Sequence, residues 1–386
     1  MSYRSRLFRW PDPYDTASTD ALFTDAAREC AAYHAAHCPA YRTLLDAARF
    51  SPDDLDAIGD LARIPAIPTA FLKTHRLRTM PADRLHTPIR ATSSGTGGRA
   101  SEIGLDWGAC FCGLSMIAKV AAPRSLLSPR PCHYIVFGYM PRRENAMAAA
   151  KTAYGYTFLA PALDRTFALR WENSRYVPDL DGVIRAIVRH AASPHPTRFI
   201  GFPAYTYFTL KKMDERGIRV RLPRGSSIML GGGWKQFWRE AVDKTVLYAL
   251  AERVLGIPEE AIAESYGAAE HPILYCDCRN HRFHVPVYSR VLIRDVKTLE
   301  PLPMGYPGLV NLISPLIRAT PLLSVLTDDL GILHPGEECG CGITSPTLEL
   351  LGRAGMEEIR TCAAGAEEIL KGTESEKEYG RVKREK

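Results

Sequence analysis

The chain has 386 residues, of which 46% are hydrophobic and 24% are charged, and its formal net charge at pH 7 is +6. This composition indicates an ordinary soluble globular protein, large enough for a sizeable core in one large or two unequal domains. No apolar run reaches the ~18 to 20 residues of a membrane span, so a membrane-spanning protein is excluded.

Charge and cysteine content narrow the possible class of protein further. The first ten residues lack the apolar stretch of a secretory signal, so we expect a cytoplasmic protein. The positive charge is not gathered into basic blocks, and residues 374–386 carry both signs, so nucleic acid is not implied. Ten cysteines without an export signal favour reduced thiols, metal ligands or a reactive thiol over a disulfide framework.

Predicted helices and strands alternate through the middle of the chain. A helical segment over residues 18–50 comes first, and the proline-punctuated link 64–68 follows it. Apolar β-rich runs then alternate with amphipathic stretches, which is typical of β-α units around a largely parallel sheet. The predicted strands are residues 134–137, 198–202 and 227–230, and the predicted helices are residues 180–192, 205–216 and 234–255.

From His281 onward the pattern changes to short strands and turns. The predicted strands there are residues 289–296, 308–314 and 324–326. This pattern predicts a small antiparallel subdomain at the end of the globular part.

A hydroxyl- and glycine-rich loop, Thr92–Gly98, follows the short apolar segment around Ile89. Its backbone N–H groups and hydroxyls suit the oxygens of a polyphosphate. No Gly-Lys-Ser/Thr follows, so a Walker A loop is excluded. A dinucleotide fingerprint fits Gly95, Gly97 and Ala100 on paper, but a strong preceding strand is missing and Asp106 is too close to be the ribose acid. A plain surface turn is the alternative.

Cysteine and histidine cluster in two stretches of the small subdomain. Cys276, Cys278, His281 and His284 form one stretch, and Cys339 and Cys341 form the other. Two such pairs would close the shell of a tetrahedral structural zinc ion. Because the C-x-C spacing is tighter than the usual C-x-x-C, thiols and surface histidines without a metal are the alternative. The predicted zinc ligands are Cys276, Cys278, His284, Cys339 and Cys341.

Five motifs follow one another between Thr92 and Arg353. After the loop come Leu230–Gly233, Glu264–Glu270, Thr327–Gly331 and Leu351–Arg353. This ordered series resembles the adenylate-forming superfamily of acyl-CoA synthetases, adenylation domains and luciferases. Three further stretches are similar to the acyl-protein synthetases of the LuxE type, and the resemblance covers essentially the whole chain. These stretches are Ile64–Lys73, Gly233–Lys235 and Glu358–Cys362.

The resemblance implies an α/β fold with mixed and parallel sheets flanked by helices, a small β-rich subdomain and a shortened C-terminal tail. Residues 1–352 would form the adenylate-forming domain, with 281–352 as the subdomain, and 353–386 a short mobile segment that carries Cys362. It also implies a ligase that activates a carboxylic acid with ATP and Mg2+ as acyl-AMP. The acyl group would then pass to Cys362 and on to a partner, such as an acyl reductase or acyltransferase.

The resemblance also assigns roles to residues. Glu270 would hold Mg2+, Tyr266 would pack on the adenine, and Asp329 with Arg353 would bind the ribose hydroxyls. Lys235 would steady the substrate carboxylate or α-phosphate, or else lie on a solvated helix face. The other nucleotide-binding residues implied are Ser93, Ser94, Gly95, Thr96, Gly97 and Gly98 for the phosphates, Gly231, Gly232 and Gly233 for the base, and Ser265 and Gly267 beside Tyr266.

The chain departs from the family pattern in two places. The usual Thr-Gly-Asp is Thr327-Asp328-Asp329, so either aspartate could bind the ribose, and we favour Asp329 by register. The stretch after Arg353 is far shorter than the lid of acyl-CoA synthetases, and Lys371-Gly372 reverses their Gly-Lys order. A built-in thiol, Cys362, would make such a lid dispensable, whereas a buried inert thiol is the alternative.

Two other functions stay open. One is a phenylacetate-type acyl- or aryl-CoA ligase, and the other is a noncatalytic nucleotide-binding partner of a reductase complex. The acyl pocket should lie between Gly201–Tyr205 and the Gly231 turn, where aromatic side chains suggest an apolar tail or ring. The sequence does not decide between a fatty and an aromatic acid, nor does it define the oligomeric state.

Overall fold

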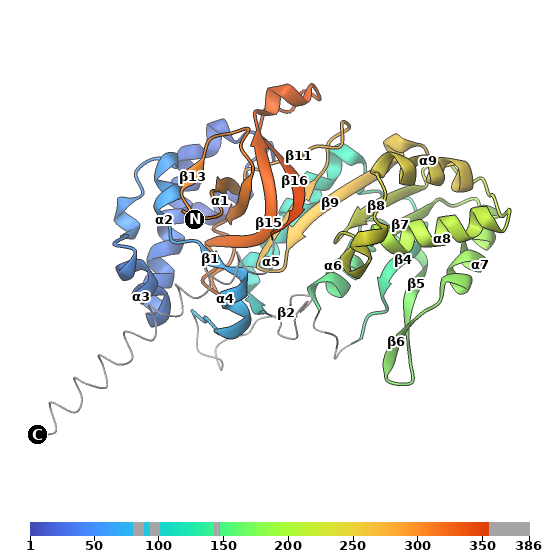
Figure 1. Ribbon diagram of the computed structural model, residues 1–386, viewed down its shortest axis with the longest axis horizontal. Helices are drawn as coiled ribbons and strands as arrows, with labels where there is room; N and C mark the ends of the chain where they lie inside the picture. The colour runs from blue at the N-terminus through green and yellow to red at the C-terminus, as the bar shows by residue number, and fades with distance from the viewer. Residues whose placement is uncertain (80–88, 93–100, 143–144, 146, 355–386) are drawn as a thin grey trace, which may run out of the picture. The chain divides into compact units, whose positions relative to one another are not determined.

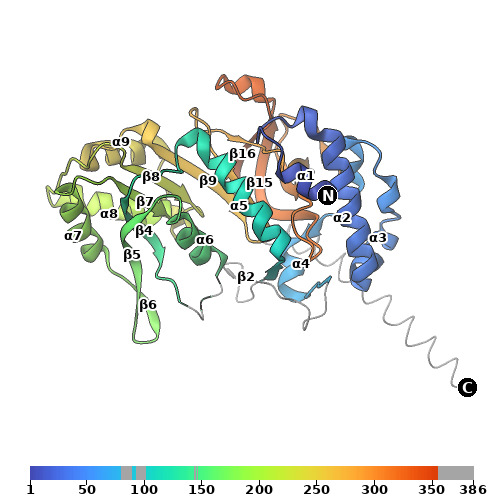
Figure 2. The same ribbon diagram turned by 180° about the vertical axis from the view of Figure 1, so that it is seen from behind.

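Two β-sheets carry the fold, and the chain divides into two compact units. Unit 1 comprises Met1–Val120, Ala268–Ile273 and the residues from Arg282 onward, and unit 2 comprises Ala121–Gly267 and Leu274–His281. The computed structural model describes all residues except 80–88, 93–100, 143–144, 146 and 355–386 (Figures 1 and 2). Among the residues described, no helix has both the length and the apolar character that a bilayer crossing requires.

The sheet of unit 2 is mostly parallel. Its seven strands have the order β10-β9-β8-β7-β4-β5-β6. Each neighbouring pair from β9 to β5 is parallel, and β5 and β6 form an antiparallel hairpin. This confirms the expected β-α arrangement. The strands are β4 (Cys132–Tyr139), β5 (Ala162–Glu172), β6 (Arg175–Pro178), β7 (Thr197–Gly201), β8 (Ser227–Gly231), β9 (Ile262–Ala268) and β10 (His271–Cys276).

Three helices pack on one face of this sheet, as Figure 1 shows, and α6 (Ala148–Tyr156) contacts strands β4 and β7. The three helices on that face are α7 (Leu180–Ala191), α8 (Pro203–Glu215) and α9 (Lys244–Leu255). Alternate strand residues such as Ile135 and Phe137 join Val183 and Ile187, one turn apart on α7, in a single buried cluster. Burial of this apolar face is what holds the helices to the sheet.

Two predicted helices are each interrupted. The stretch 234–255 consists of a short 3-10 helix and then α9, because Asp243 caps a new helix by accepting a hydrogen bond from the Thr245 amide at 2.8 Å. The stretch 18–50 contains α2 (Asp20–His37) and α3 (Pro39–Ala47), separated at Cys38. Proline disfavours the helical conformation of the residue before it, so the first helix ends there.

Unit 1 is built on a second, mainly antiparallel sheet with the order β11-β16-β15-β14-β12-β13, and β1 joins it in parallel beside β15. The subdomain expected after His281 is thus antiparallel. Its strands are β1 (Ile67–Pro68), β11 (Phe283–His284), β12 (Arg290–Arg294), β13 (Pro301–Leu302), β14 (Gly308–Ile313), β15 (Ser324–His334) and β16 (Thr347–Arg353).

Helices and a small hairpin complete unit 1, and Figure 2 shows α1, α2 and α3 gathered beside that sheet. The remaining elements of this unit are α1 (Tyr3–Phe8), α4 (Thr69–Thr74), α5 (Trp107–Ala121), β2 (Ile89–Thr92) and β3 (Glu102–Leu105). Short 3-10 helices, some of them in unit 2, are η1 (Ala17–Thr19), η2 (Pro52–Asp54), η3 (Ile58–Arg63), η4 (Ala122–Arg124), η5 (Lys235–Glu240), η6 (Glu259–Ala261) and η7 (Gly336–Cys339).

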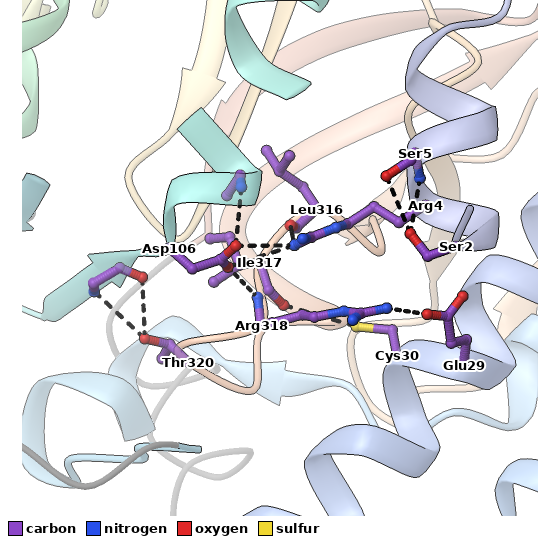
Figure 3. A network of polar contacts seen from close by, with 12 residues as sticks. Ser2, Arg4, Ser5, Glu29, Cys30, Asp106, Leu316, Ile317, Arg318 and Thr320 are labelled. Atoms are coloured by element: carbon purple, nitrogen blue, oxygen red, sulfur yellow. Dashed lines mark hydrogen bonds and ion pairs between the residues drawn. The ribbon is translucent and has the colours of Figure 1, made fainter. Parts of the chain in front are cut away.

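One carboxylate, Asp106, joins several elements of unit 1 (Figure 3). It accepts a hydrogen bond from the Ala109 amide at 3.0 Å, which caps α5, and another from the Arg318 amide at 2.8 Å. Arg4 of α1 lies 3.1 Å from the same carboxylate and also donates to the Leu316 carbonyl at 2.8 Å. Asp106 therefore holds α1 and α5 to the loop that precedes β15. This structural role agrees with the exclusion of Asp106 as a ribose ligand.

Candidate functional site

The carboxyl ends of parallel strands β7, β8 and β9 meet at one edge of the unit 2 sheet. Ligands of open α/β sheets bind at this edge. The residues that follow β7 and β8 include Phe202, Gly232 and Gly233, and Tyr266 lies near the carboxyl end of β9. Several predicted site residues therefore share one edge of one sheet.

The predicted glycine turn begins where β8 ends. Gly231 lies directly opposite Ser265 of β9, whose hydroxyl donates to the Leu230 carbonyl at 3.0 Å. A Cβ at position 231 would lie 2.6 Å from Ser265 Oγ, so any larger residue would displace that hydroxyl. Gly232 and Gly233 have φ angles of +77° and +65°, which favour glycine. The backbone at this strand end is thus left without side chains, as close approach to a planar ligand requires.

Aromatic rings surround the same strand ends. Tyr205 and Phe208 of α8 lie in edge-to-face contact with Phe237, with ring centroids 5.7 Å and 5.1 Å apart. Tyr207 and Trp234 have ring centroids 5.8 Å apart. Helix α8, which begins within the predicted pocket segment Gly201–Tyr205, and the segment after the Gly231 turn are therefore in contact through aromatic side chains.

Tyr266 and Lys235 lie at the carboxyl ends of β9 and β8. The ring of Tyr266 is half-buried, and its centroid is 5.7 Å from that of Tyr275 in β10. Gly267 is exposed beside it. Lys235 is the first residue of η5, and the structure does not describe its side chain.

Glu270 lies in the two-residue turn that joins β9 to β10, and it is only 5% exposed. A buried carboxylate is costly unless cations or hydrogen-bond donors compensate its charge. Such a side chain is suited to holding Mg2+, which prefers carboxylate oxygens.

The two adjacent aspartates of β15 have different neighbours within unit 1. Asp328 accepts a hydrogen bond from Thr69 Oγ1 at 2.6 Å, and Lys73 Nζ lies 3.6 Å from its other oxygen. Asp329 lies directly opposite Arg353 of β16, whose Nε is 3.5 Å from Asp329 Oδ1. The structure thus pairs Asp329 with Arg353, the two residues that the resemblance assigned to the ribose. Asp328 instead contacts Thr69 and Lys73.

Thr69 and Lys73 are neighbours of the site that sequence reasoning did not single out. They belong to α4, which begins directly after β1, and β1 pairs with Val325 and Leu326 just before the aspartates. In the sequence, the motif Ile64–Lys73 only marks the resemblance. The parallel pairing of β1 with β15 brings this motif next to the two aspartates.

Three of the predicted zinc ligands gather in unit 1. The ligand atoms of His284, Cys339 and Cys341 all lie within 4.8 Å of one another. Cys278 belongs to the segment of unit 2 that ends at His281. Cys276 of β10 is buried, and among the described residues its sulfur does not belong to the group of ligand atoms that lie within 4.8 Å of one another.

A second polar cluster lies within unit 2 and was not predicted. Asp164 of β5 lies 3.2 Å from both His133 Nδ1 and His190 Nε2, and the two imidazole rings stack with centroids 4.2 Å apart. Burial lowers the pKa of His190 despite the nearby carboxylate. These residues are far apart in sequence, so no spacing pattern could have revealed them.

Two predicted parts of the site lie outside the described residues. They are the loop residues Ser93, Ser94, Gly95, Thr96, Gly97 and Gly98, and the C-terminal Cys362. The strands on either side of the loop are described: β2 and β3 pair antiparallel, with Thr92 opposite Glu102. The loop therefore connects two strands of a hairpin.

Comparison with known proteins gives a consistent result. Residues 9–371 match the family described as "Acyl-protein synthetase, LuxE". A long-chain-fatty-acid–luciferin-component ligase of Vibrio harveyi is 25% identical over 316 residues, covering 80% of this chain and 78% of that protein. A phenylacetate–coenzyme A ligase of Thermus thermophilus is 27% identical over 350 residues, covering 86% of this chain and 70% of that protein.

Solved structures of 2-hydroxyisobutyryl-CoA ligase resemble the fold. An open conformation in complex with 2-HIB-AMP and CoA has a TM-score of 0.66 at 16% identity, covering 89% of this chain and 76% of that one. The postadenylation state in complex with R3-HIB-AMP has a TM-score of 0.67, also at 16% identity, with 89% and 69% covered. At this identity the likeness concerns the fold, and it confirms the expected α/β class with two sheets flanked by helices.

Proposed function

Because the chain belongs to the acyl-protein synthetase family of the LuxE type, we propose that it activates a carboxylic acid with ATP and carries the acyl group on Cys362. The family and the fold make the chain an acid–thiol ligase of the adenylate-forming kind. The identity of the thiol and the roles of single residues are what the proposal adds. A cytoplasmic location, where ATP is available, is part of it.

The first step joins the acid to AMP. A carboxylate oxygen attacks the α-phosphorus of ATP, the bond to the bridging oxygen breaks, and pyrophosphate leaves with its electron pair. Donors from Ser93, Ser94, Gly95, Thr96, Gly97 and Gly98 would hold the outer phosphates, and Mg2+ held by Glu270 would neutralise their charge. The burial of Glu270 supports this assignment.

Other residues would orient the nucleotide and the acid. The side-chain-free turn Gly231–Gly233 supports a role in accepting the adenine, with Tyr266, Ser265 and Gly267 on the next strand. Asp329, held opposite Arg353, would bind the ribose hydroxyls. Lys235 would steady the carboxylate or the α-phosphate.

The second step moves the acyl group to sulfur. The thiolate of Cys362 attacks the acyl carbon, a C–S bond forms, the bond to the AMP oxygen breaks, and AMP leaves. A partner such as an acyl reductase or acyltransferase would then accept the acyl group. The aromatic rings of α8 and of the segment after β8 support an apolar tail or ring as the acid.

The paired variants Cys362→Ser and Cys110→Ser test the acceptor. We expect Cys362→Ser to keep carboxylate-dependent ATP–pyrophosphate exchange and to lose at least ~90% of covalent labelling by radioactive acid, because only the sulfur attack is removed. Cys110→Ser, at a half-buried thiol of α5, should keep both activities. Screening fatty and aromatic acids in the exchange assay would identify the substrate.

A second function, acyl- or aryl-CoA ligase, has support from the relationship to the phenylacetate–coenzyme A ligase. Undiminished CoA-thioester synthesis by Cys362→Ser would establish that function in place of the first. Absence of carboxylate-dependent exchange at saturating ATP would instead indicate a noncatalytic nucleotide-binding protein.

A further inference from the structure

We propose that His284, Cys339 and Cys341 bind a structural zinc ion. The site is independent of the nucleotide chemistry and would stabilise the antiparallel subdomain. Its argument begins with the imidazole of His284, which is fully buried in β11.

Hydrogen bonding fixes the protonation of that imidazole. His284 Nδ1 lies 2.7 Å from the Ser345 carbonyl oxygen, which can only accept a hydrogen bond, so Nδ1 carries the proton. The other nitrogen, Nε2, is then the one with a lone pair, and it lies 3.2 Å from Cys341 Sγ. An imidazole oriented by a carbonyl on one nitrogen and presenting the other is the usual arrangement of a metal-bound histidine.

The backbone around Cys341 has the turn that a metal-binding cysteine needs. Gly340 and Gly342, on either side of it, have φ angles of +68° and +97°, which tighten the chain. The Ile343 amide donates to Cys341 Sγ at 3.4 Å. This hydrogen bond fixes the position of the sulfur within the turn.

The spacing of the ligand atoms fits a tetrahedron. In a tetrahedral zinc site, neighbouring sulfur and nitrogen ligand atoms are about 3.5–3.8 Å apart. The potential ligand atoms of His284, Cys339 and Cys341 all lie within 4.8 Å of one another, so small side-chain movements would bring them to these distances. Thiolates with an imidazole select zinc over the harder cations Mg2+ and Ca2+.

These three side chains supply three of the four positions of a tetrahedral ion. Cys276 is not included, because among the described residues its sulfur does not belong to the group of ligand atoms that lie within 4.8 Å of one another.

Metal analysis of the full-length protein tests the proposal. Protein produced with zinc in the medium should contain about one zinc per chain, measured by mass spectrometry of the metals. Cys341→Ser and Cys339→Ser should lower this to about 0.1 or less, whereas Cys276→Ser should keep it. A full content in Cys341→Ser together with loss in Cys276→Ser would overturn the ligand assignment.

Cobalt substitution of the unmutated protein keeps the test valid if the variants do not fold. Co2+ should give the intense visible bands of a tetrahedral ion together with thiolate charge-transfer absorption, and added Zn2+ should abolish both. Folded, full-length protein with less than about 0.1 zinc per chain and no such spectrum would refute the site. ATP–pyrophosphate exchange by folded, zinc-depleted protein should persist, so failure of this proposal is distinguishable from failure of the proposed activity.

Discussion

Two neighbouring aspartates show how residue chemistry depends on local contacts. Asp328 accepts a hydrogen bond from Thr69 and forms an ion pair with Lys73, whereas Asp329 lies opposite Arg353 on the neighbouring strand. In the sequence they are equivalent carboxylates. Their different partners assign Asp328 to the structure of unit 1 and leave Asp329 as the candidate for the ribose.

The paired variants Asp329→Asn and Asp328→Asn test this assignment. We expect Asp329→Asn to raise the KM for ATP by roughly 10- to 100-fold, because a charged hydrogen bond contributes about 1.5–3 kcal/mol. Asp328→Asn should change the KM less than ~3-fold and lower the free energy of unfolding by about 1 kcal/mol, since its ion pair is partly exposed. Exchange kinetics and urea denaturation measure the two effects. The reverse pattern would transfer the ribose role to Asp328.

At the scale of elements, the approach of β4 to β7 depends on one glycine. Gly201 ends β7 with φ +135°, and a Cβ there would overlap the Phe137 carbonyl of β4. The following residues lead into α8, which contributes rings to the proposed acyl pocket. The strand end and the pocket are therefore linked through a position that no other residue can occupy.

Replacement of this glycine tests the link. Gly201→Ala should lower the free energy of unfolding by about 3 kcal/mol or more, because backbone strain and overlap with the main chain add together. Gly217→Ala is the matched control: its φ is +66°, but nothing lies within 4 Å of the added methyl, so only about 1 kcal/mol of strain is expected. Equal losses in urea denaturation would show that overlap with Phe137 contributes nothing.

At the scale of the whole molecule, buried neutral histidines govern acid stability. Desolvation lowers the pKa of His34 and of His271 to about 3. His34 contacts Thr79 and the Ile317 carbonyl, and His271 contacts the Ser289 hydroxyl. The Ile317 carbonyl partly favours a protonated His34, but desolvation is the larger effect.

Stability should therefore fall as the pH falls below about 6.5. Below that pH both histidines are protonated in the unfolded chain, whereas in the folded chain they stay neutral down to about pH 3. Each histidine therefore lowers the free energy of unfolding by about 1.4 kcal/mol per pH unit. Aspartates with lowered pKa, such as Asp179, lose their contribution only as the pH falls below about 4, so a range of pH 5 to 6.5 isolates the histidines.

Urea denaturation across that range measures the slope. His271→Gln should reduce the loss of stability per pH unit by about 1.4 kcal/mol, whatever its effect on stability at pH 7. The same substitution at exposed His37 provides the control. A slope unchanged by His271→Gln would contradict the assignment of this histidine.

Sequence patterns were sufficient to predict the order of the β-α units and the family. Periodicity reports which residues are buried, and turn glycines report backbone conformations, because both are local properties of the chain. The helix boundaries at Pro39 and Asp243 were missed, because the predicted helices 18–50 and 234–255 continued through them. Elements without clear periodicity, such as β5, β9 and α5, were not predicted.

Which of several chemically identical side chains meet depends on the three-dimensional fold. The fold pairs Asp329 with Arg353 and brings Thr69 and Lys73 to Asp328. It also joins His133, Asp164 and His190 in one cluster. These contacts depend on strand register and on parallel pairings between distant segments, such as β1 with β15, and no local pattern of residues encodes them.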